Sequence, residues 1–181
     1  MLAVVDTSTL NYLIRLGVQD ALPAIYGRIL APHAVLLEMR HPEAPDMVRE
    51  WAVKPPAWLE KVQVAEIESS LPTELGAGER EAISLALATS ADVLVVDDWA
   101  GRQAAEALKI QVAGTLSVLL KISLLERSDF RAILTRLLQL GFRASRAVQA
   151  DMLARYEEAR RDSASTTRFR RSLEVRSRLV F

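Results

Sequence analysis

The chain of 181 residues contains no cysteine and only two histidines, His33 and His41, which we expect to be ordinary polar residues. The absence of cysteine excludes a disulfide framework, a thiolate zinc site and a thiol nucleophile, and it fits a reducing cytosol. The longest apolar stretches, such as 93–96 and 116–120, are far shorter than the ~20 residues of a membrane-spanning helix. The start of the chain lacks the basic segment of a secretory signal peptide. We therefore expect a soluble, cytoplasmic protein.

The sequence also lacks an excess of charge of either sign, because 23 basic residues balance 23 acidic ones. The balance is uneven along the chain. Residues 163–181 carry a net charge of +4, from five arginines and one glutamate, and residues 1–162 carry a net charge of −4. A protein that holds many phosphates usually has a basic excess, so contact with nucleic acid must come here from a local patch or from metal ions. At about 100–200 residues per domain, we expect one domain over residues 1–162, followed by a basic, flexible C-terminal tail over residues 163–181.

Short apolar runs alternate with helical patterns along the chain. Leu2–Val5 and Val93–Val96 are continuous apolar runs, as is typical of strands that are buried on both faces. Residues 59–65 alternate between apolar and polar, which predicts an edge strand. Strands that alternate with helices predict an α/β fold in which a parallel sheet lies between layers of helices.

Two helices are expected near the end of the chain. Ser128 is the expected N-cap of the first, which Gly141 closes, and Ser145 is the expected N-cap of the second, which ends at about Arg160. Serine is favoured at this position because its hydroxyl accepts a hydrogen bond from a free amide of the first helical turn.

Aspartates follow two of the predicted strands. Asp6 comes directly after Leu2–Val5, and the pair Asp97-Asp98 comes directly after Val93–Val96. The carboxyl ends of parallel strands lie at one edge of the sheet, where open α/β sheets bind their ligands. A single aspartate between a strand and a helix commonly does no more than cap the helix. Two adjacent carboxylates, however, repel each other unless a cation or solvent separates them.

Two glutamates lie at positions where a charge is costly. Glu38 interrupts an apolar helix, and Glu79 shares a helix face with three apolar residues. As a residue of the first turn, Glu79 could instead complement the helix dipole, and Glu81 on the adjacent face is expected to be solvated. Carboxylate oxygens without cysteine or well-spaced histidine suit Mg²⁺ or Mn²⁺ rather than zinc. We expect these acids to converge on one divalent cation site: Asp6, Glu38, Glu79, Asp97 and Asp98.

The order of four motifs resembles the PIN-domain family, and in particular its DUF3368-like subgroup. The motifs are VVDTS, LLEM, GEREAISLA and LVVDDWAGR, and the resemblance covers residues 1–155. The family consists of small metal-dependent ribonucleases, many of which are toxins of VapC-type toxin–antitoxin pairs. The resemblance therefore implies a three-layer α/β/α PIN-like fold with a short-stranded, mainly parallel central sheet.

The resemblance also assigns roles to residues. Asp6 matches the first acid of the family, Glu38 the second, Glu79 the third, where many relatives have aspartate, and either Asp97 or Asp98 matches the fourth. These acids are thereby implied to be both catalytic residues and ligands of Mg²⁺ or Mn²⁺.

Other polar residues are expected to assist the acids. Hydroxyls beside the first acid and after a later strand are the predicted supporting groups, and arginines close to the acids are the candidate contacts to the RNA backbone. The supporting hydroxyls are those of Thr7, Ser8 and Thr115. The candidate RNA contacts are Arg80, Arg102 and Arg40.

The resemblance implies an RNA substrate, a protein antitoxin as partner and a homodimer, for which the helices at 10–16 or 45–53 could supply the surface.

Alternative functions remain open. The chain could be a catalytically inactive PIN-like module that binds nucleic acid or protein, or a structural subunit whose acids only cap helices. A receiver domain or a haloacid-dehalogenase-type phosphatase fits less well, because the acidic pair occurs late and the first strand ends in Asp6-Thr7-Ser8 rather than Asp-x-Asp.

Overall fold

The computed structural model describes the backbone of residues 1–177 and the side chains of residues 1–162. The chain divides into two compact units, Met1–Ile122 and Ser123–Phe181, which are described separately. Among the described residues, every helix is too short or too polar to cross a bilayer.

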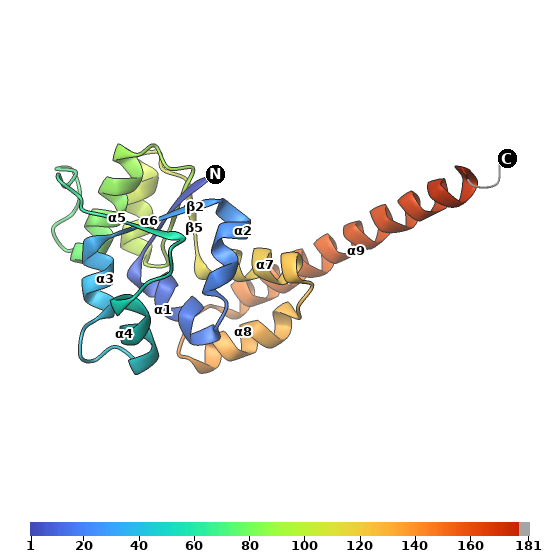
Figure 1. Cartoon of the computed structure of the whole chain (residues 1–181), viewed down its shortest axis with the longest axis horizontal. Coiled ribbons are helices and arrows are strands. Elements are labelled where there is room, and N and C mark those ends of the chain that lie inside the picture. The colour runs from blue at the N-terminus through green and yellow to red at the C-terminus, as the bar shows by residue number, and fades with distance from the viewer. Residues whose placement is uncertain (178–181) are drawn as a thin grey trace. The chain divides into compact units, whose positions relative to one another are not determined.

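The first unit, coloured from blue to yellow in Figure 1, is built on a five-stranded sheet with the strand order β3-β2-β1-β4-β5. Every neighbouring pair of strands is parallel, so the carboxyl ends of all the strands lie together, at what we call the carboxyl edge of the sheet. Residues 59–62 form an outermost strand, as predicted. The strands are short: β1 Leu2–Val5, β2 Arg28–Pro32, β3 Leu59–Val62, β4 Val93–Val95 and β5 Val112–Ala113.

Helices cover both faces of this sheet. The side chains of Ala3 and Val4 point to opposite faces, because consecutive residues of a strand alternate, and both are fully buried. The three-layer α/β/α arrangement was therefore predicted correctly. The helices of the first unit are α1 Thr7–Leu16, α2 Leu22–Tyr26, α3 His33–Met39, α4 Asp46–Val53, α5 Ala77–Ala88 and α6 Trp99–Ala107, and α7 Thr115–Glu126 begins in the first unit and ends in the second.

One face of the sheet packs against α5 and α6. Val4 and Leu94 from the two central strands belong to the same buried cluster as Ile83 of α5 and Ala105 of α6. Complete burial of a large aliphatic side chain stabilises a fold by about 1.5–3 kcal/mol. This packing fixes the first turns of α5 and α6 at the carboxyl edge of the sheet.

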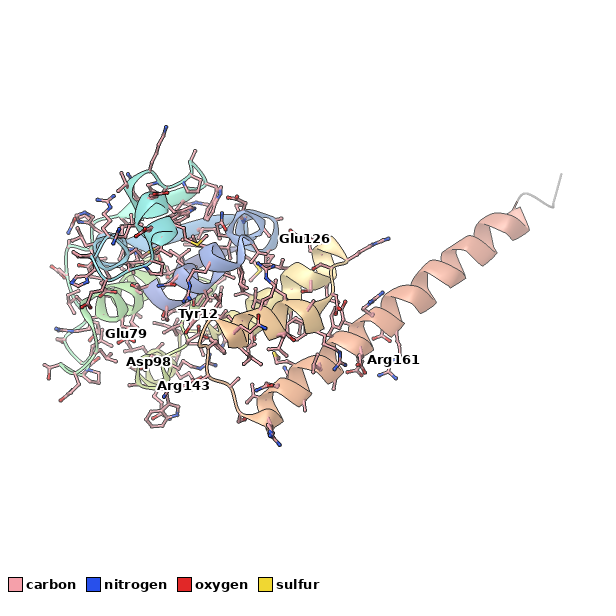
Figure 2. The ribbon with its side chains drawn as sticks, turned by 90° about the horizontal axis from the view of Figure 1, so that it is seen from below. Tyr12, Glu79, Asp98, Glu126, Arg143 and Arg161 are labelled. Atoms are coloured by element: carbon pink, nitrogen blue, oxygen red, sulfur yellow. The ribbon has the colours of Figure 1, made fainter. Side chains whose placement is uncertain are left out.

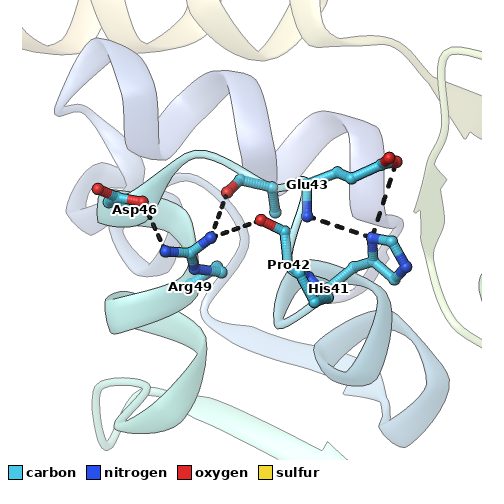
Figure 3. Close-up of polar contacts among 6 residues, drawn as sticks. His41, Pro42, Glu43, Asp46 and Arg49 are labelled. Carbon is cyan, nitrogen blue, oxygen red and sulfur yellow. Dashed lines mark hydrogen bonds and ion pairs between the residues drawn. The ribbon is translucent and has the colours of Figure 1, made fainter.

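Arginines fix the connection between α3 and α4, and Figure 3 shows the contacts of Arg49. Arg49 donates to the carbonyl oxygen of Pro42 at 2.5 Å and to Asp46 at 2.6 Å. Arg40 donates two hydrogen bonds to the carbonyl oxygen of Ala52, at 2.9 and 2.7 Å, so its guanidinium is engaged in holding α3 to α4. His41 is exposed, as expected for an ordinary polar residue, and its Nδ1 accepts from the backbone N–H of Glu43 at 3.3 Å and lies 3.9 Å from the Glu43 carboxylate.

The second unit contains α8 Phe130–Gln139 and α9 Arg146–Ser177. The rings of Phe130 and Tyr156 lie 5.6 Å apart between their centroids, and the Tyr156 hydroxyl donates to the carbonyl oxygen of Ser128 at 2.7 Å. Arg131 of α8 and Glu157 of α9 form an ion pair at 3.2 Å. These contacts hold α8 and α9 together.

The ends of these helices differ from prediction in two places. The N-cap of α8 is Asp129 rather than Ser128, because the Asp129 carboxylate, which directly precedes the helix, accepts from the backbone N–H of Arg131. Ser145 does accept from Val148, as predicted, but α9 continues beyond Arg160. No glycine or proline occurs in α9, so its sequence contains neither of the residues that most strongly end a helix. The side chains of the predicted flexible tail, residues 163–181, lie outside those that the structure describes.

Candidate functional site

The predicted acids lie at the carboxyl edge of the sheet and on the helices around it. Asp6 directly follows β1, and Asp97 and Asp98 follow the neighbouring strand β4. The backbone N–H of Asp6 donates to the carbonyl oxygen of Val95 at 3.1 Å, which extends the β1–β4 pairing to the point where the acids begin. Glu38 comes from the last turn of α3 and Glu79 from the first turn of α5.

Asp6 is the most deeply buried of these acids, with only 2% of its surface exposed. One carboxylate oxygen accepts from the backbone N–H of Thr9 at 2.8 Å and so caps α1, and the other accepts from the Ser8 hydroxyl at 2.6 Å. Burial raises the pKa of Asp6 to about 6, although these hydrogen bonds oppose the shift. The negative charge of Asp97 adds to the increase, which places the two carboxylates within electrostatic range of each other.

Asp97 is held by Thr115, at the beginning of α7. Its two carboxylate oxygens accept from the backbone N–H of Thr115 at 2.8 Å and from the Thr115 hydroxyl at 2.5 Å. Burial raises the pKa of Asp97, whereas the hydrogen bonds to Thr115 and the positive charge of Arg102 lower it. Arg102 also donates to the carbonyl oxygen of Val96 at 3.2 Å, so its guanidinium lies beside the end of β4.

Glu38 is held from two sides. Its Oε1 accepts from the backbone N–H of Gly78 at 2.7 Å, and its Oε2 accepts from the Thr7 hydroxyl. A Cβ at position 78 would lie 2.5 Å from Glu38 Oε2. Any side chain at this position would therefore require the Glu38 carboxylate to move.

Glu79 and Asp98 lie next to each other at the beginnings of α5 and α6 (Figure 2). Glu79 accepts from the backbone N–H of Gly76 and Asp98 from that of Gly101, both at 3.0 Å. A Cβ at Gly101 would lie 3.9 Å from an oxygen of Asp98 and 3.9 Å from the carboxyl carbon of Glu79. Burial raises the pKa of Glu79, and the charges of Asp98 and Glu38 raise it further.

The structure thus arranges the acids in two groups. Asp6 and Asp97 form one, and Glu38, Glu79 and Asp98 form the other, with Thr7 between them because it follows Asp6 in the chain and donates to Glu38. Each acid accepts one backbone N–H.

The donor chemistry of the site fits Mg²⁺ or Mn²⁺, since every candidate ligand is a carboxylate. Among the described side chains, however, no group of three or more acids or histidines is arranged to hold one ion. Mg²⁺ usually keeps several waters in proteins and is bound through one or two carboxylates. A pair such as Asp6 and Asp97 would supply that smaller number of ligands.

The predicted supporting residues all contact the acids. Ser8 and Thr7 donate their hydroxyls to Asp6 and Glu38, and Thr115 donates to Asp97. Of the candidate RNA contacts, Arg102 lies beside Asp97, and Arg80 is half-buried with its Nε making no hydrogen bond.

Glu81 was predicted wrongly. Instead of facing solvent, this half-buried carboxylate accepts from the backbone N–H of Ala34 at 3.0 Å. Pro32, which precedes α3, has no side-chain group that can cap the helix. The signal in the sequence was this proline at the N-cap, which leaves the first amides of α3 in need of an acceptor from elsewhere.

This combination, a short parallel sheet between helices with acids at its carboxyl edge, defines an α/β protein with a candidate anion- and metal-handling site. The DUF3368 family model, described as a PIN domain, matches residues 2–158. The chain belongs to the PIN-domain family.

Two solved structures are similar to this chain. One is a PilT N-terminus domain protein, SSO1118, from the archaeon Sulfolobus solfataricus P2, with 14% identity, coverage of 67% of this chain and 93% of that chain, and a TM-score of 0.49. The other is the PIN domain endonuclease Utp24, with 9% identity, coverage of 62% of this chain and 84% of that chain, and a TM-score of 0.47. No curated protein sequence matches the chain.

Proposed function

We propose that this PIN-domain protein is a divalent-metal-dependent ribonuclease that hydrolyses RNA phosphodiester bonds, and that it acts as the toxin of a toxin–antitoxin pair. The observation that carries the proposal is the placement of Asp6 and Asp97 at the ends of two neighbouring parallel strands, where burial raises the pKa of each. Buried carboxylates with raised pKa values at the ligand-binding edge of an α/β sheet mark a candidate functional site.

A divalent cation would relieve the electrostatic cost of this arrangement. The ligands that we propose are the five acids Asp6, Glu38, Glu79, Asp97 and Asp98, of which Asp6 and Asp97 are the pair that one ion would bind. When bound, Mg²⁺ or Mn²⁺ supplies an activated water and neutralises the phosphate oxygens.

The chain's own residues preorganise the site. The hydroxyls of Ser8, Thr7 and Thr115 and the backbone amides fix the orientations of the carboxylates, which reduces the reorganisation needed during the reaction. Asp6 and Asp98 are the N-caps of α1 and α6, and Glu79 lies in the first turn of α5, so the positive ends of three helix dipoles stabilise the ionised carboxylates.

The test is to replace the acids singly by amides of the same shape. We expect Asp6→Asn and Asp97→Asn to abolish divalent-dependent RNA cleavage and to weaken Mn²⁺ binding in calorimetry, while circular dichroism stays unchanged. Asp92→Asn is the matched control. Asp92 accepts from the Leu2 amide at 2.6 Å, at the opposite end of β4, and an asparagine retains that acceptor. Undiminished cleavage by both site variants, in a preparation cleared of contaminating nuclease, would refute the proposal.

A second candidate is a catalytically inactive PIN-like module that binds nucleic acid or protein. It is favoured by the hydrogen bond that each acid already receives from a backbone amide, and by the lack of a three-ligand group among the described residues. RNA binding without cleavage, combined with no heat of Mn²⁺ binding to the wild-type protein, would support this candidate over the nuclease.

The proposed partners are a protein antitoxin and a second copy of the chain, in the cytoplasm. A neighbouring gene for a small DNA-binding protein, whose product co-purifies with this chain, would support the toxin assignment.

For the homodimer, α4 offers Met47 and Val53, which are exposed, while Trp51 and Trp58 pack against each other with their ring centroids 6.1 Å apart. We expect a Val53→Arg variant to be monomeric in light scattering, and a dimer that survives this change would exclude α4 as the interface.

A further inference from the structure

Trp99 is the most exposed large hydrophobic residue of the described chain, with 70% of its surface accessible. It is the first residue of α6 and directly follows Asp98, so the two Cα atoms are about 3.8 Å apart. A large aromatic ring therefore lies in water beside the acids, where it is accessible to a ligand of the site.

We propose that Trp99 is a substrate-positioning residue whose indole stacks on an unpaired base of the RNA, next to the phosphate that enters the acidic site. This inference rests on the proposed function and adds to it the residue that holds the base. Stacking on an aromatic side chain accepts any base, because every base presents a π-face.

The orientation of α6 leaves the indole free for this contact. Gly101 and Ala105 are buried and face the core. Trp99 precedes Gly101 by two residues, or about 200° around the helix, so its side chain points away from that face. Arg102 lies between these two directions, and its guanidinium reaches the end of β4 beside Asp97. A base on Trp99 would therefore place the adjoining phosphate on the side of Arg102 and the acids.

The charge of the first unit favours a contact of this kind. Residues 1–122 contain ten basic and sixteen acidic side chains, a net charge of −6. Attraction between cationic side chains and phosphates, which usually dominates the binding of nucleic acids, is weak on such a surface. Stacking does not depend on charge, so it can hold RNA at an acidic site.

The surroundings of Trp99 favour a base over a protein partner. A protein interface buries an aromatic anchor among other contacts that exclude water. The exposed neighbours of Trp99 on α6, Ala100 and Gln103, are small or polar. The other exposed large hydrophobic residues of the first unit belong to other elements or to the chain terminus: Met1, Leu37, Met47, Val53, Ile67 and Leu87.

The experiment compares three variants with the wild type. A short single-stranded RNA, added in EDTA and low salt so that it stays uncleaved, should quench the fluorescence of the wild type. In Trp99→Tyr, which keeps Trp51 and Trp58, the quenching should disappear while the affinity stays within about threefold. Trp99→Ala should weaken binding about 5- to 150-fold, the range expected for one stacked base. Leu87→Ala, which truncates an exposed hydrophobic residue in the last turn of α5, is the matched control and should bind as the wild type does.

Cleavage kinetics provide the second measurement. With Mg²⁺ present, Trp99→Ala should raise KM by a similar factor and leave kcat nearly unchanged, and Trp99→Tyr should restore KM. An unchanged affinity and KM in Trp99→Ala would overturn the inference while leaving the nuclease proposal intact. If the wild type cleaves no RNA, the nuclease proposal fails, and the EDTA titration still decides whether Trp99 stacks on a base. Quenching by a protein partner but not by RNA would also overturn the inference.

Discussion

The backbone N–H of Gly78 donates to Glu38 at 2.7 Å and joins two residues that are 40 positions apart in the sequence. A methyl group at position 78 would lie 2.5 Å from the same carboxylate, so Gly78→Ala must displace Glu38. We expect this variant to lose about 1–3 kcal/mol of unfolding free energy and most of its RNA cleavage. Urea unfolding and cleavage rates measure the two effects.

Gly76→Ala is the control for this variant. At position 76 a Cβ would lie 3.7 Å from Glu79 and 4.0 Å from Glu38, which is ordinary contact distance. We expect wild-type stability and cleavage. Equal losses in the two variants would show that helix α5, rather than the carboxylate of Glu38, is sensitive to the added methyl group.

Thr115→Val removes the hydroxyl that holds Asp97 and keeps the shape of the side chain. Since the remaining amide alone would orient the carboxylate, we expect Mn²⁺ affinity and cleavage to fall about 10- to 100-fold, as is typical of groups that orient metal ligands. Thr115→Ser keeps the hydroxyl and should retain most of both. Calorimetry with Mn²⁺ separates the loss of binding from a loss of fold, and equal behaviour of the two variants would contradict the role of the hydroxyl.

Asp6 makes stability depend on pH. Burial raises its pKa in the folded state to about 6, above the value of about 3.9 in an unfolded chain. Between these values the folded state holds a proton that the unfolded state has lost, so the unfolding free energy of the metal-free protein should fall as the pH rises from about 4 to 6. Above pH 7 the folded state carries the full cost of burying the ionised Asp6 carboxylate, which lowers the unfolding free energy by about 2–3 kcal/mol at 1.4 kcal/mol per pKa unit.

The variant Asp6→Asn should remove that dependence. An asparagine oxygen can still cap α1, so we expect the variant to equal or exceed the wild type in stability at pH 8 and to show a flatter profile between pH 4 and 6. Chemical denaturation in EDTA across this range measures the difference. A wild-type profile that rises through the same window would contradict the assigned shift.

Glu81 should matter for stability and not for cleavage. Glu81→Ala leaves the Ala34 amide without its acceptor and should cost about 1 kcal/mol, whereas Glu81→Gln retains an acceptor oxygen and should cost less. Thermal unfolding measures both. Loss of cleavage in the fully folded Glu81→Gln variant would instead place Glu81 in the site.

The features that local sequence determines were predicted well. Leu2–Val5 and the strand at 93–95 form the centre of the sheet because continuous apolar runs are stable only when both faces are covered. Asp6 caps α1 through Thr9, three residues away, which is a spacing that a sequence pattern reveals.

Contacts between distant segments were not predictable in the same way. Glu38 accepts hydrogen bonds from Thr7, 31 residues before it, and from Gly78, 40 residues after it. The pair Asp97-Asp98 also could not be resolved, because a shift of one residue in an extended chain reverses the direction of a side chain. In the structure Asp97 turns to Thr115 and Asp98 caps α6.

Because each of the five acids accepts a hydrogen bond from a backbone amide, ligand binding at the site can be followed without labelling a side chain. A cation or phosphate that draws the carboxylate oxygens away would release five amide protons, and their exchange with deuterium would accelerate even as the rest of the sheet became more protected. The reporting amides belong to Thr9, Gly76, Gly78, Gly101 and Thr115.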